Sequence, residues 1–166
     1  MKKVLLFFVF ASVTSLSFAQ TSKSNLMLGG SASYNSYSYE GGSSSTELNV
    51  NPSIGYFVID NLALGAQLGY NLPSGSEATI MGGPFVRYYF VSLASNVKLF
   101  GQADAEFSKT AGASEISTNI GGSAGLASFI SKSTALEVSF GYHKNTLAKL
   151  SQFGVNVGFQ IHFGGK

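Results

Sequence analysis

The stretch FGVNVGFQIHF, residues 153–163, alternates apolar side chains with small or polar ones without a break. One face carries Phe153, Val155, Val157, Phe159, Ile161 and Phe163, and the other carries Gly154, Asn156, Gly158, Gln160 and His162. A repeat of two residues is the period of a β-strand, because successive side chains point to opposite sides of the sheet. A shift of one residue would reverse both faces, so the pattern also specifies the register of the strand.

The same alternation recurs along the chain, most clearly at residues 62–72, and helical periodicity is rare. It predicts eight strands, at residues 25–37, 46–58, 62–72, 78–90, 97–107, 115–128, 134–143 and 152–163. Long polar connections alternate with tighter ones such as IDN and FISKS. An even number of strands with this alternation predicts an all-β fold, an eight-stranded antiparallel up-and-down barrel.

The composition indicates which face of such a barrel meets water. Charged residues make up only 11% of the 166 residues, against about 25% in an average soluble domain. A soluble barrel with an apolar interior would show an outer surface rich in Lys and Glu, whereas the polar strand faces here carry mostly Ser, Gly, Asn and Gln. We therefore expect a transmembrane barrel, apolar toward lipid and polar within.

Aromatic residues near the predicted strand ends point the same way. Tyr and Phe gather where the two interfaces of a membrane would lie. The residues concerned are Tyr34, Tyr56, Tyr70, Tyr88, Phe90, Phe107, Tyr142, Phe153 and Phe163.

The first residues have the pattern of a secretory signal peptide. Lys2 and Lys3 precede an apolar run over residues 4–13, and small residues lead to Ala19. Polar residues 12, 14, 15 and 17 interrupt the run, which disfavours a membrane anchor. We expect cleavage after Ala19, so that residues 1–19 are the signal peptide and residues 20–166 the barrel domain.

Other functional classes find little support in the composition. The chain has no Cys, which excludes both a disulfide framework and a lipidated N-terminal Cys. A formal net charge of +2, with scattered basic residues, does not suggest binding of nucleic acid.

The last predicted strand resembles the C-terminal assembly signal of outer-membrane barrels through Asn156, Gly158, Ile161 and Phe163, although Gly164, Gly165 and Lys166 follow the aromatic residue. Two further stretches carry a resemblance, NPSIGYFVIDNLALGAQLGY (51–70) and GPFVRYYF (83–90). With them, the chain is similar to the small outer-membrane β-barrel domain family of Gram-negative bacteria. This family comprises the relatives of OmpA, OmpX and OmpW and includes porin-like members. The resemblance implies a place in the cell outer membrane among its lipids and lipopolysaccharide. It also implies that the barrel-assembly machinery and periplasmic chaperones act on the chain during biogenesis.

With the apolar faces outward, the lumen receives a mixed set of polar and charged residues. These are Glu47, Gln67, Arg87, Tyr89, Lys98, Gln102, Asp104, Glu106, Glu137, Gln160 and His162. We expect Arg87 to pair with Asp104, Glu106 or Glu137, in a polar network to which Gln67 and Gln160 also belong. A complete network would plug the barrel, whereas water threading through it would leave a path for small solutes or ions.

The sequence leaves three functions to compare. The first is a structural or porin-like membrane component without catalysis or cofactor. The second is a surface protein whose outer loops, chiefly residues 38–45, bind an unidentified partner. The third is a barrel enzyme acting on lipid A, for which His143, Ser139 and Glu137 do not have the expected spacing, so we expect His143 to be a rim residue in contact with water or head groups. His162 has no second ligand at a suitable spacing, so we expect no metal site.

Overall fold

A computed structural model describes residues 21–37, 45–73, 77–112, 115–146 and 151–164, apart from the side chains of residues 33–37, 45–47 and 152. The strands are β1 (Leu26–Tyr37), β2 (Ser45–Ile59), β3 (Leu62–Pro73), β4 (Thr79–Ala94), β5 (Val97–Thr110), β6 (Ser117–Phe129), β7 (Thr134–Asn145) and β8 (Ser151–Phe163). The predicted signal peptide, residues 1–19, lies outside the described residues. Within them, no helix is long and apolar enough to cross a membrane.

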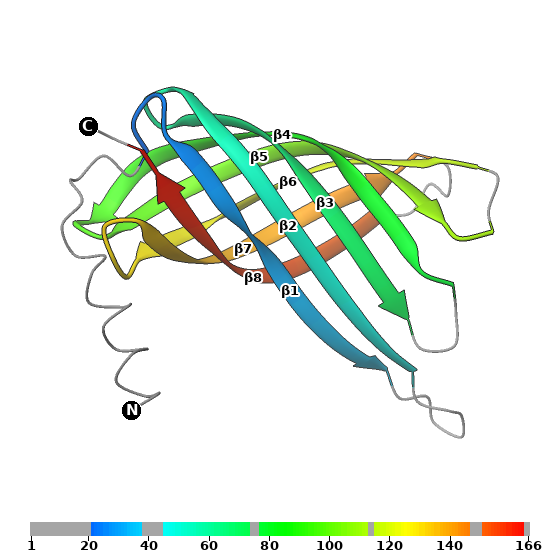
Figure 1. Cartoon of the computed structure of the whole chain (residues 1–166). Coiled ribbons are helices and arrows are strands. Elements are labelled where there is room, and N and C mark those ends of the chain that lie inside the picture. Colours follow the sequence, from blue (N-terminus) through cyan, green and yellow to red (C-terminus); the bar gives the residue numbers. More distant parts are fainter. Residues whose placement is uncertain (1–20, 38–44, 74–76, 113–114, 147–150, 165–166) are drawn as a thin grey trace, which may run out of the picture.

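The eight strands form a closed antiparallel barrel in sequence order, as the alternation predicted (Figure 1). Closure is made by β1 and β8, which pair from Leu26 opposite Phe163 to Ser31 opposite Gly158. Over these six pairs the barrel has no free edge whose backbone groups would lack partners in lipid, whereas β1 beyond Ser31 and β8 before Gly158 do not pair with each other.

The two ends of the barrel differ. The tight connections, after β2, β4 and β6, lie at the end where β1 begins and β8 finishes, which we call the turn end (Figure 1). β1, β3, β5 and β7 finish at the opposite end, which we call the loop end (Figure 1). The loop of residues 38–44 falls outside the described residues.

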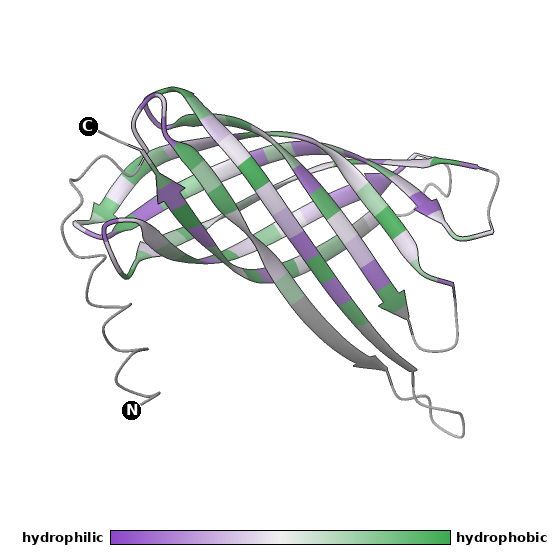
Figure 2. Cartoon of the chain, in the orientation of Figure 1, coloured by the Kyte–Doolittle hydropathy of each residue, from purple (hydrophilic) through white to green (hydrophobic). Residues whose placement is uncertain are grey.

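The apolar faces of the strands point outward, which excludes the soluble barrel with an apolar interior. In β8, Val157 is 61% exposed whereas Gln160 is 3% exposed. Figure 2 shows the same alternation of hydropathy along the other strands. In GPFVRYYF, Val86, Tyr88 and Phe90 face outward and Phe85, Arg87 and Tyr89 inward, as predicted.

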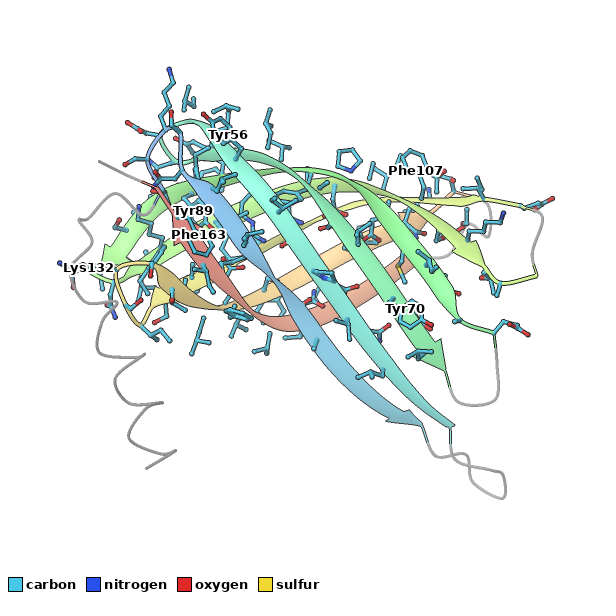
Figure 3. All side chains as sticks on the ribbon, in the orientation of Figure 1. Tyr56, Tyr70, Tyr89, Phe107, Lys132 and Phe163 are labelled. Carbon is cyan, nitrogen blue, oxygen red and sulfur yellow. The ribbon has the colours of Figure 1, made fainter. Side chains whose placement is uncertain are left out.

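Exposed aromatic residues lie toward both ends of the outer wall. Tyr56 and Phe163 lie toward the turn end and Tyr70 and Phe107 toward the loop end (Figure 3). This arrangement agrees with the predicted pair of aromatic girdles. The side chain of Tyr34 is not among those described.

One strand end differs from the prediction by several residues. β4 continues to Ala94, whereas the alternation predicted an end at Phe90. Its pairing with β5 is irregular between Tyr89 and Val91 and again between Ser92 and Ala94. Such β-bulges place an extra residue in one strand, so Phe90 and Val91 both face outward and the period of two is lost.

Candidate functional site

The lumen is the candidate site, and its turn-end half is filled by apolar and aromatic side chains. This plug consists of Met27, Phe57, Phe85, Tyr89, Phe100, Phe129 and His162, none more than 4% exposed. The rings contact one another, with centroids 5.6 Å apart for Phe57 and His162, 5.4 Å for Phe129 and His162, and 5.8 Å for Tyr89 and Phe100. The expectation of a polar lumen is therefore wrong for this half of the barrel.

The plug follows from the sequence at the turn ends of the strands. There, apolar residues come in consecutive pairs such as Tyr56-Phe57 and Leu99-Phe100. Because neighbours on a strand face opposite ways, one member of each pair covers the wall and the other fills the lumen. An eight-stranded barrel is only wide enough to be filled in this way.

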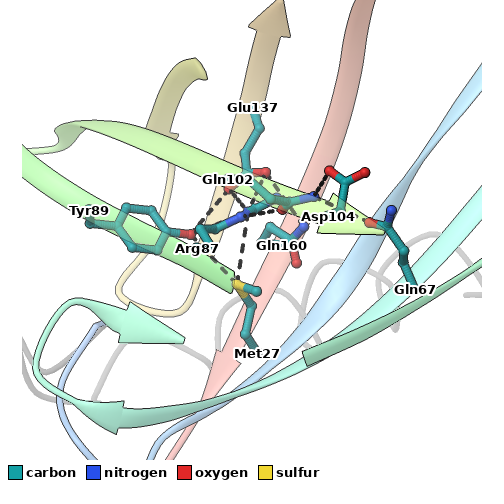
Figure 4. A network of polar contacts seen from close by, with 8 residues as sticks. All are labelled: Met27, Gln67, Arg87, Tyr89, Gln102, Asp104, Glu137 and Gln160. Atoms are coloured by element: carbon teal, nitrogen blue, oxygen red, sulfur yellow. Dashed lines mark hydrogen bonds and ion pairs between the residues drawn. The ribbon is translucent and has the colours of Figure 1, made fainter. Parts of the chain in front are cut away.

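Arg87, on β4, lies above the plug and bonds to Glu137 on β7. Its Nη1 atom lies 2.9 Å from both carboxylate oxygens of Glu137 (Figure 4). The guanidinium carbon lies 4.5 Å from the centroid of the Phe100 ring, which is within the range of a cation–π contact. Both charged residues are buried, so each depends on the other for compensation of its lost hydration.

One tyrosine and two glutamine side chains add further bonds to this ion pair. The Tyr89 hydroxyl lies 3.3 Å from Glu137 Oε1, and Gln160 Nε2 lies 3.5 Å from Glu137 Oε2. Arg87 also donates from Nε to Gln102 Oε1 at 2.9 Å. The pair is thus held by groups from β4, β5, β7 and β8.

Gln102 connects the ion pair to the carboxylates nearer the loop end. Its amide nitrogen donates to Gln67 Oε1 at 3.2 Å and to Asp104 Oδ1 at 3.3 Å. Gln67 in turn donates to Glu106 Oε1 at 2.8 Å. The six residues predicted for the network, Gln67, Arg87, Asp104, Glu106, Glu137 and Gln160, thus lie in one connected set once Gln102 is included, although Asp104 and Glu106 do not bond to Arg87.

His143 faces the lumen, so the expected alternative of contact with lipid head groups is not what the structure has, whereas its partly exposed side chain can still contact water. Its Nε2 atom lies 2.9 Å from Asp104 Oδ2. The Asp104 side chain is almost fully buried, whereas that of His143 is partly exposed. Alternation along β7 already placed His143 on the face of Glu137, so the sequence held the signal for this contact.

One further residue of the expected lumen set lies outside this network, and another is not described. Lys98 lies at the turn-end mouth, where its Nζ atom donates to Thr21 Oγ1 at 2.6 Å. Thr21 Oγ1 also donates to Asn61 Oδ1 at 2.6 Å, so the segment before β1 is attached to the turn between β2 and β3. The side chain of Glu47 is not described.

The residues of the predicted assembly signal all lie on β8, with Ile161 and Phe163 on the face away from the lumen. Asn156 lies opposite Ser139 of β7, and Gly158 lies opposite Glu137 of β7 and Ser31 of β1. Gly158 therefore sits at the junction that closes the barrel.

Beyond the loop-end carboxylates, the lumen is lined by uncharged polar groups. Asn71 donates to Asn49 at 2.5 Å, and Asn145 donates to Ser117 at 2.7 Å and to Asn119 at 2.8 Å. Among the described residues, no group of three or more His, Asp or Glu side chains could hold a metal ion. Hydrogen-bonding side chains characterise this end among the residues that the structure describes.

Comparison with known proteins identifies the fold. No family model matches the chain, and no curated protein matches it. Solved structures that are similar to this chain include three outer-membrane proteins. The N-terminal barrel domain of OprF from Pseudomonas aeruginosa has a TM-score of 0.62 and 13% identity, over 85% of this chain and 98% of that one. Neisserial surface protein A has a TM-score of 0.61 and 18% identity, over 84% of this chain and 96% of that one, and the outer-membrane protein OprG from Pseudomonas aeruginosa has a TM-score of 0.60 and 10% identity, over 89% and 99%. The chain has the fold of a small outer-membrane β-barrel.

Proposed function

We propose that this chain is an integral outer-membrane protein that serves as a structural component of the membrane, with a closed lumen and no catalytic activity. The observation that carries the proposal is the outer wall, on which large apolar residues are exposed on every strand. A soluble protein rarely exposes contiguous apolar patches above a few hundred Å². Lipid is the solvent that suits such a wall.

The filled lumen supports the closed state. The plug occupies the turn-end half, and the network around Arg87 and Glu137 covers it on the loop side. The lumen at the loop end therefore stops at this network and the plug below it. This arrangement gives no support to a porin-like role. The interaction role depends on residues 38–45, of which residues 38–44 lie outside the described residues and residue 45 is described only in its backbone.

The absence of catalysis is part of the proposal. A His paired to a buried Asp could act as a general base if a nucleophile lay within hydrogen-bond reach. Ser139, the serine considered for catalysis, lies on β7 four residues before His143 and opposite Asn156. The bond of His143 to Asp104 and the contacts around it support a structural role.

Membrane fractionation and gel migration test this proposal. We expect the chain in the outer-membrane fraction, with faster migration before heating than after it, because a folded barrel resists detergent until boiled. Recovery from the soluble periplasmic fraction would contradict the membrane assignment.

A matched pair of variants at Val138, an exposed wall residue in the middle of β7, tests the same point in vitro. Val138→Arg places a charge against lipid and should lower the free energy of unfolding in vesicles by about 2–4 kcal/mol if Val138 lies near the bilayer centre. Val138→Leu should leave it nearly unchanged. Equal stability of the two variants would indicate that this wall does not face hydrocarbon.

A further inference from the structure

A groove of about 640 Å³ lies on the outer wall near the loop end, across β3, β4 and β5. It exists because Gly82 of β4 has no side chain between two bulky neighbours in register, Leu68 of β3 and Phe107 of β5. In the next row toward the loop end, Tyr70, Ile80 and Lys109 lie side by side in the same way. The groove therefore runs along β4, with bulky residues on both sides.

The surface of the groove is almost entirely hydrocarbon. Leu68 and Phe107 on the two sides and Ile80 on β4 between them are all more than half exposed, so the protein itself does not cover their side chains. Ile116, beyond the β5–β6 connection, contributes further apolar surface at the loop end. An exposed apolar trough of this kind suits a flexible hydrocarbon chain.

Lys109 provides a charge at one side of the groove. It is exposed on the outward face of β5, two residues beyond Phe107 and opposite Ile80. A lysine near the end of a membrane-spanning strand extends its ammonium group to the interface, where anionic lipid head groups lie. Tyr70, across the groove, belongs to the loop-end aromatic girdle at the same interface (Figure 3).

We propose that this groove is a binding site for a phosphate-bearing lipid of the outer leaflet, with one acyl chain against Gly82 and the phosphate against the Lys109 ammonium group. The proposal rests on the proposed membrane location. A hydrocarbon trough beside a cation is complementary to a lipid that carries an anionic head: the trough would accept an acyl chain of any lipid, and the cation selects the lipid with a negative head group.

The absence of Trp from the chain allows a direct test. The Tyr70→Trp variant would carry one fluorescent reporter in the groove. The Tyr142→Trp variant is its matched control, because Tyr142 is also an exposed residue near the loop end and has Lys144 two residues further along the same face, away from the groove. Both are refolded into phosphatidylcholine vesicles containing a minor fraction of phosphatidic acid brominated on its acyl chains.

We expect brominated phosphatidic acid to be enriched about fivefold over brominated phosphatidylcholine at the groove reporter, where an acyl chain in the trough keeps the phosphate beside Lys109, and less at the Tyr142→Trp reporter, where Lys144 lies away from the groove. In the Tyr70→Trp background, Lys109→Gln should abolish this preference, whereas Lys144→Gln should preserve it. Gly82→Leu should reduce quenching by both lipids, since it fills the trough beside Leu68. Heat-modifiable migration checks that each variant has folded.

The outcomes separate this inference from the proposed function. Equal quenching of the Tyr70→Trp and Tyr142→Trp reporters by both lipids would overturn the lipid site and leave the membrane barrel in place. A preference that survives Lys109→Gln would also overturn it, because the phosphate would then not be held by this lysine. Failure of any brominated lipid to quench either reporter would contradict the membrane location itself.

Discussion

Arg87 is the residue on which the packing of the lumen depends most directly. It is a cation between an aromatic ring and a carboxylate, Phe100 on one side and Glu137 on the other. Removal of two charges from water costs several kcal/mol each, so a buried pair contributes little net stability compared with apolar residues of similar size. The pair instead raises the free energy of any conformation in which only one of the two charges is buried. It therefore favours a single arrangement of β4 relative to β7.

This account predicts how the two charges depend on each other. Arg87→Leu should lower the free energy of unfolding by about 3–5 kcal/mol, because Glu137 would remain buried without its partner. Glu137→Leu should cost a similar amount. The double variant should recover most of either loss, since no uncompensated charge remains, and urea unfolding in lipid vesicles would measure all four proteins. Losses that simply add in the double variant would show that the two residues act independently.

The partner of Arg87 shows what the sequence could and could not predict at this scale. Alternation placed Arg87, Asp104, Glu106 and Glu137 on one face, and the structure agrees for all four. It could not choose among the three acids, because alternation fixes the face of a residue and not its height in the barrel. Height depends on the stagger between strands, which places Asp104 beside His143 and leaves Glu137 for Arg87.

At the scale of the strands, glycine sets how closely the lumen can be packed. A methyl group on Gly65 of β3 would overlap the Ile54 carbonyl oxygen and the ring of Phe85, which lies over this glycine. Gly154 of β8 also faces the lumen, but a methyl group there would meet nothing within 4 Å. The two positions share an orientation and differ only in what surrounds them.

These glycines give a matched pair of variants. Gly65→Ala should destabilise the barrel by about 1–3 kcal/mol, because Phe85 or the backbone of β2 must move. Gly154→Ala should be neutral or stabilise it by about 0.4–1 kcal/mol through the reduced freedom of the unfolded chain. The midpoint of urea unfolding in vesicles would compare them, and equal losses would mean that the contact with Phe85 does not limit packing.

The strand boundaries show where a regular pattern stops being informative. Most predicted ends agree with the structure within about three residues, because alternation continues through each strand to a polar connection. β4 is the exception, since its bulges near Val91 and Ala94 interrupt the alternation while hydrogen bonding to β5 continues. Residues 91–94 therefore resembled a connection in the sequence.

At the scale of the whole molecule, the barrel combines an apolar wall with a lumen that changes character along its axis. The aromatic plug occupies the turn end, the Arg87 network lies beyond it, and uncharged amides and hydroxyls line the loop end. The sequence predicted the barrel and its polar network, because both follow from alternation. The plug was predicted only in part. Alternation placed Phe85, Tyr89 and His162 in the lumen, but Met27, Phe57, Phe100 and Phe129 were not among the residues predicted there, although consecutive apolar pairs at the turn ends indicated that more apolar residues must face inward.

A plug of this kind predicts that the folded protein does not conduct ions. In planar bilayers, we expect no stepwise conductance from the wild-type protein, because rings that are almost fully buried leave no room for a column of water between Phe57 and Phe129. Removal of two plug rings, in the variant with Tyr89→Ala and Phe100→Ala, should open a leak. Each truncation costs about 3–5 kcal/mol, so heat-modifiable migration must show that the variant still folds.

A control with the same loss of aromatic rings is available on the outer wall. Phe140 and Phe153 stack on each other there, with ring centroids 6.4 Å apart, and both are more than half exposed. Phe140→Ala with Phe153→Ala should remain silent in the same bilayers, because neither ring lies in the lumen. Stepwise conductance from the wild-type protein would refute the closed lumen. If the wall variant leaks as much as the plug variant, the leak comes from destabilised barrels and not from removal of the plug. Only a leak confined to the loss of Tyr89 and Phe100 would assign the closure of this barrel to the aromatic side chains at its turn end.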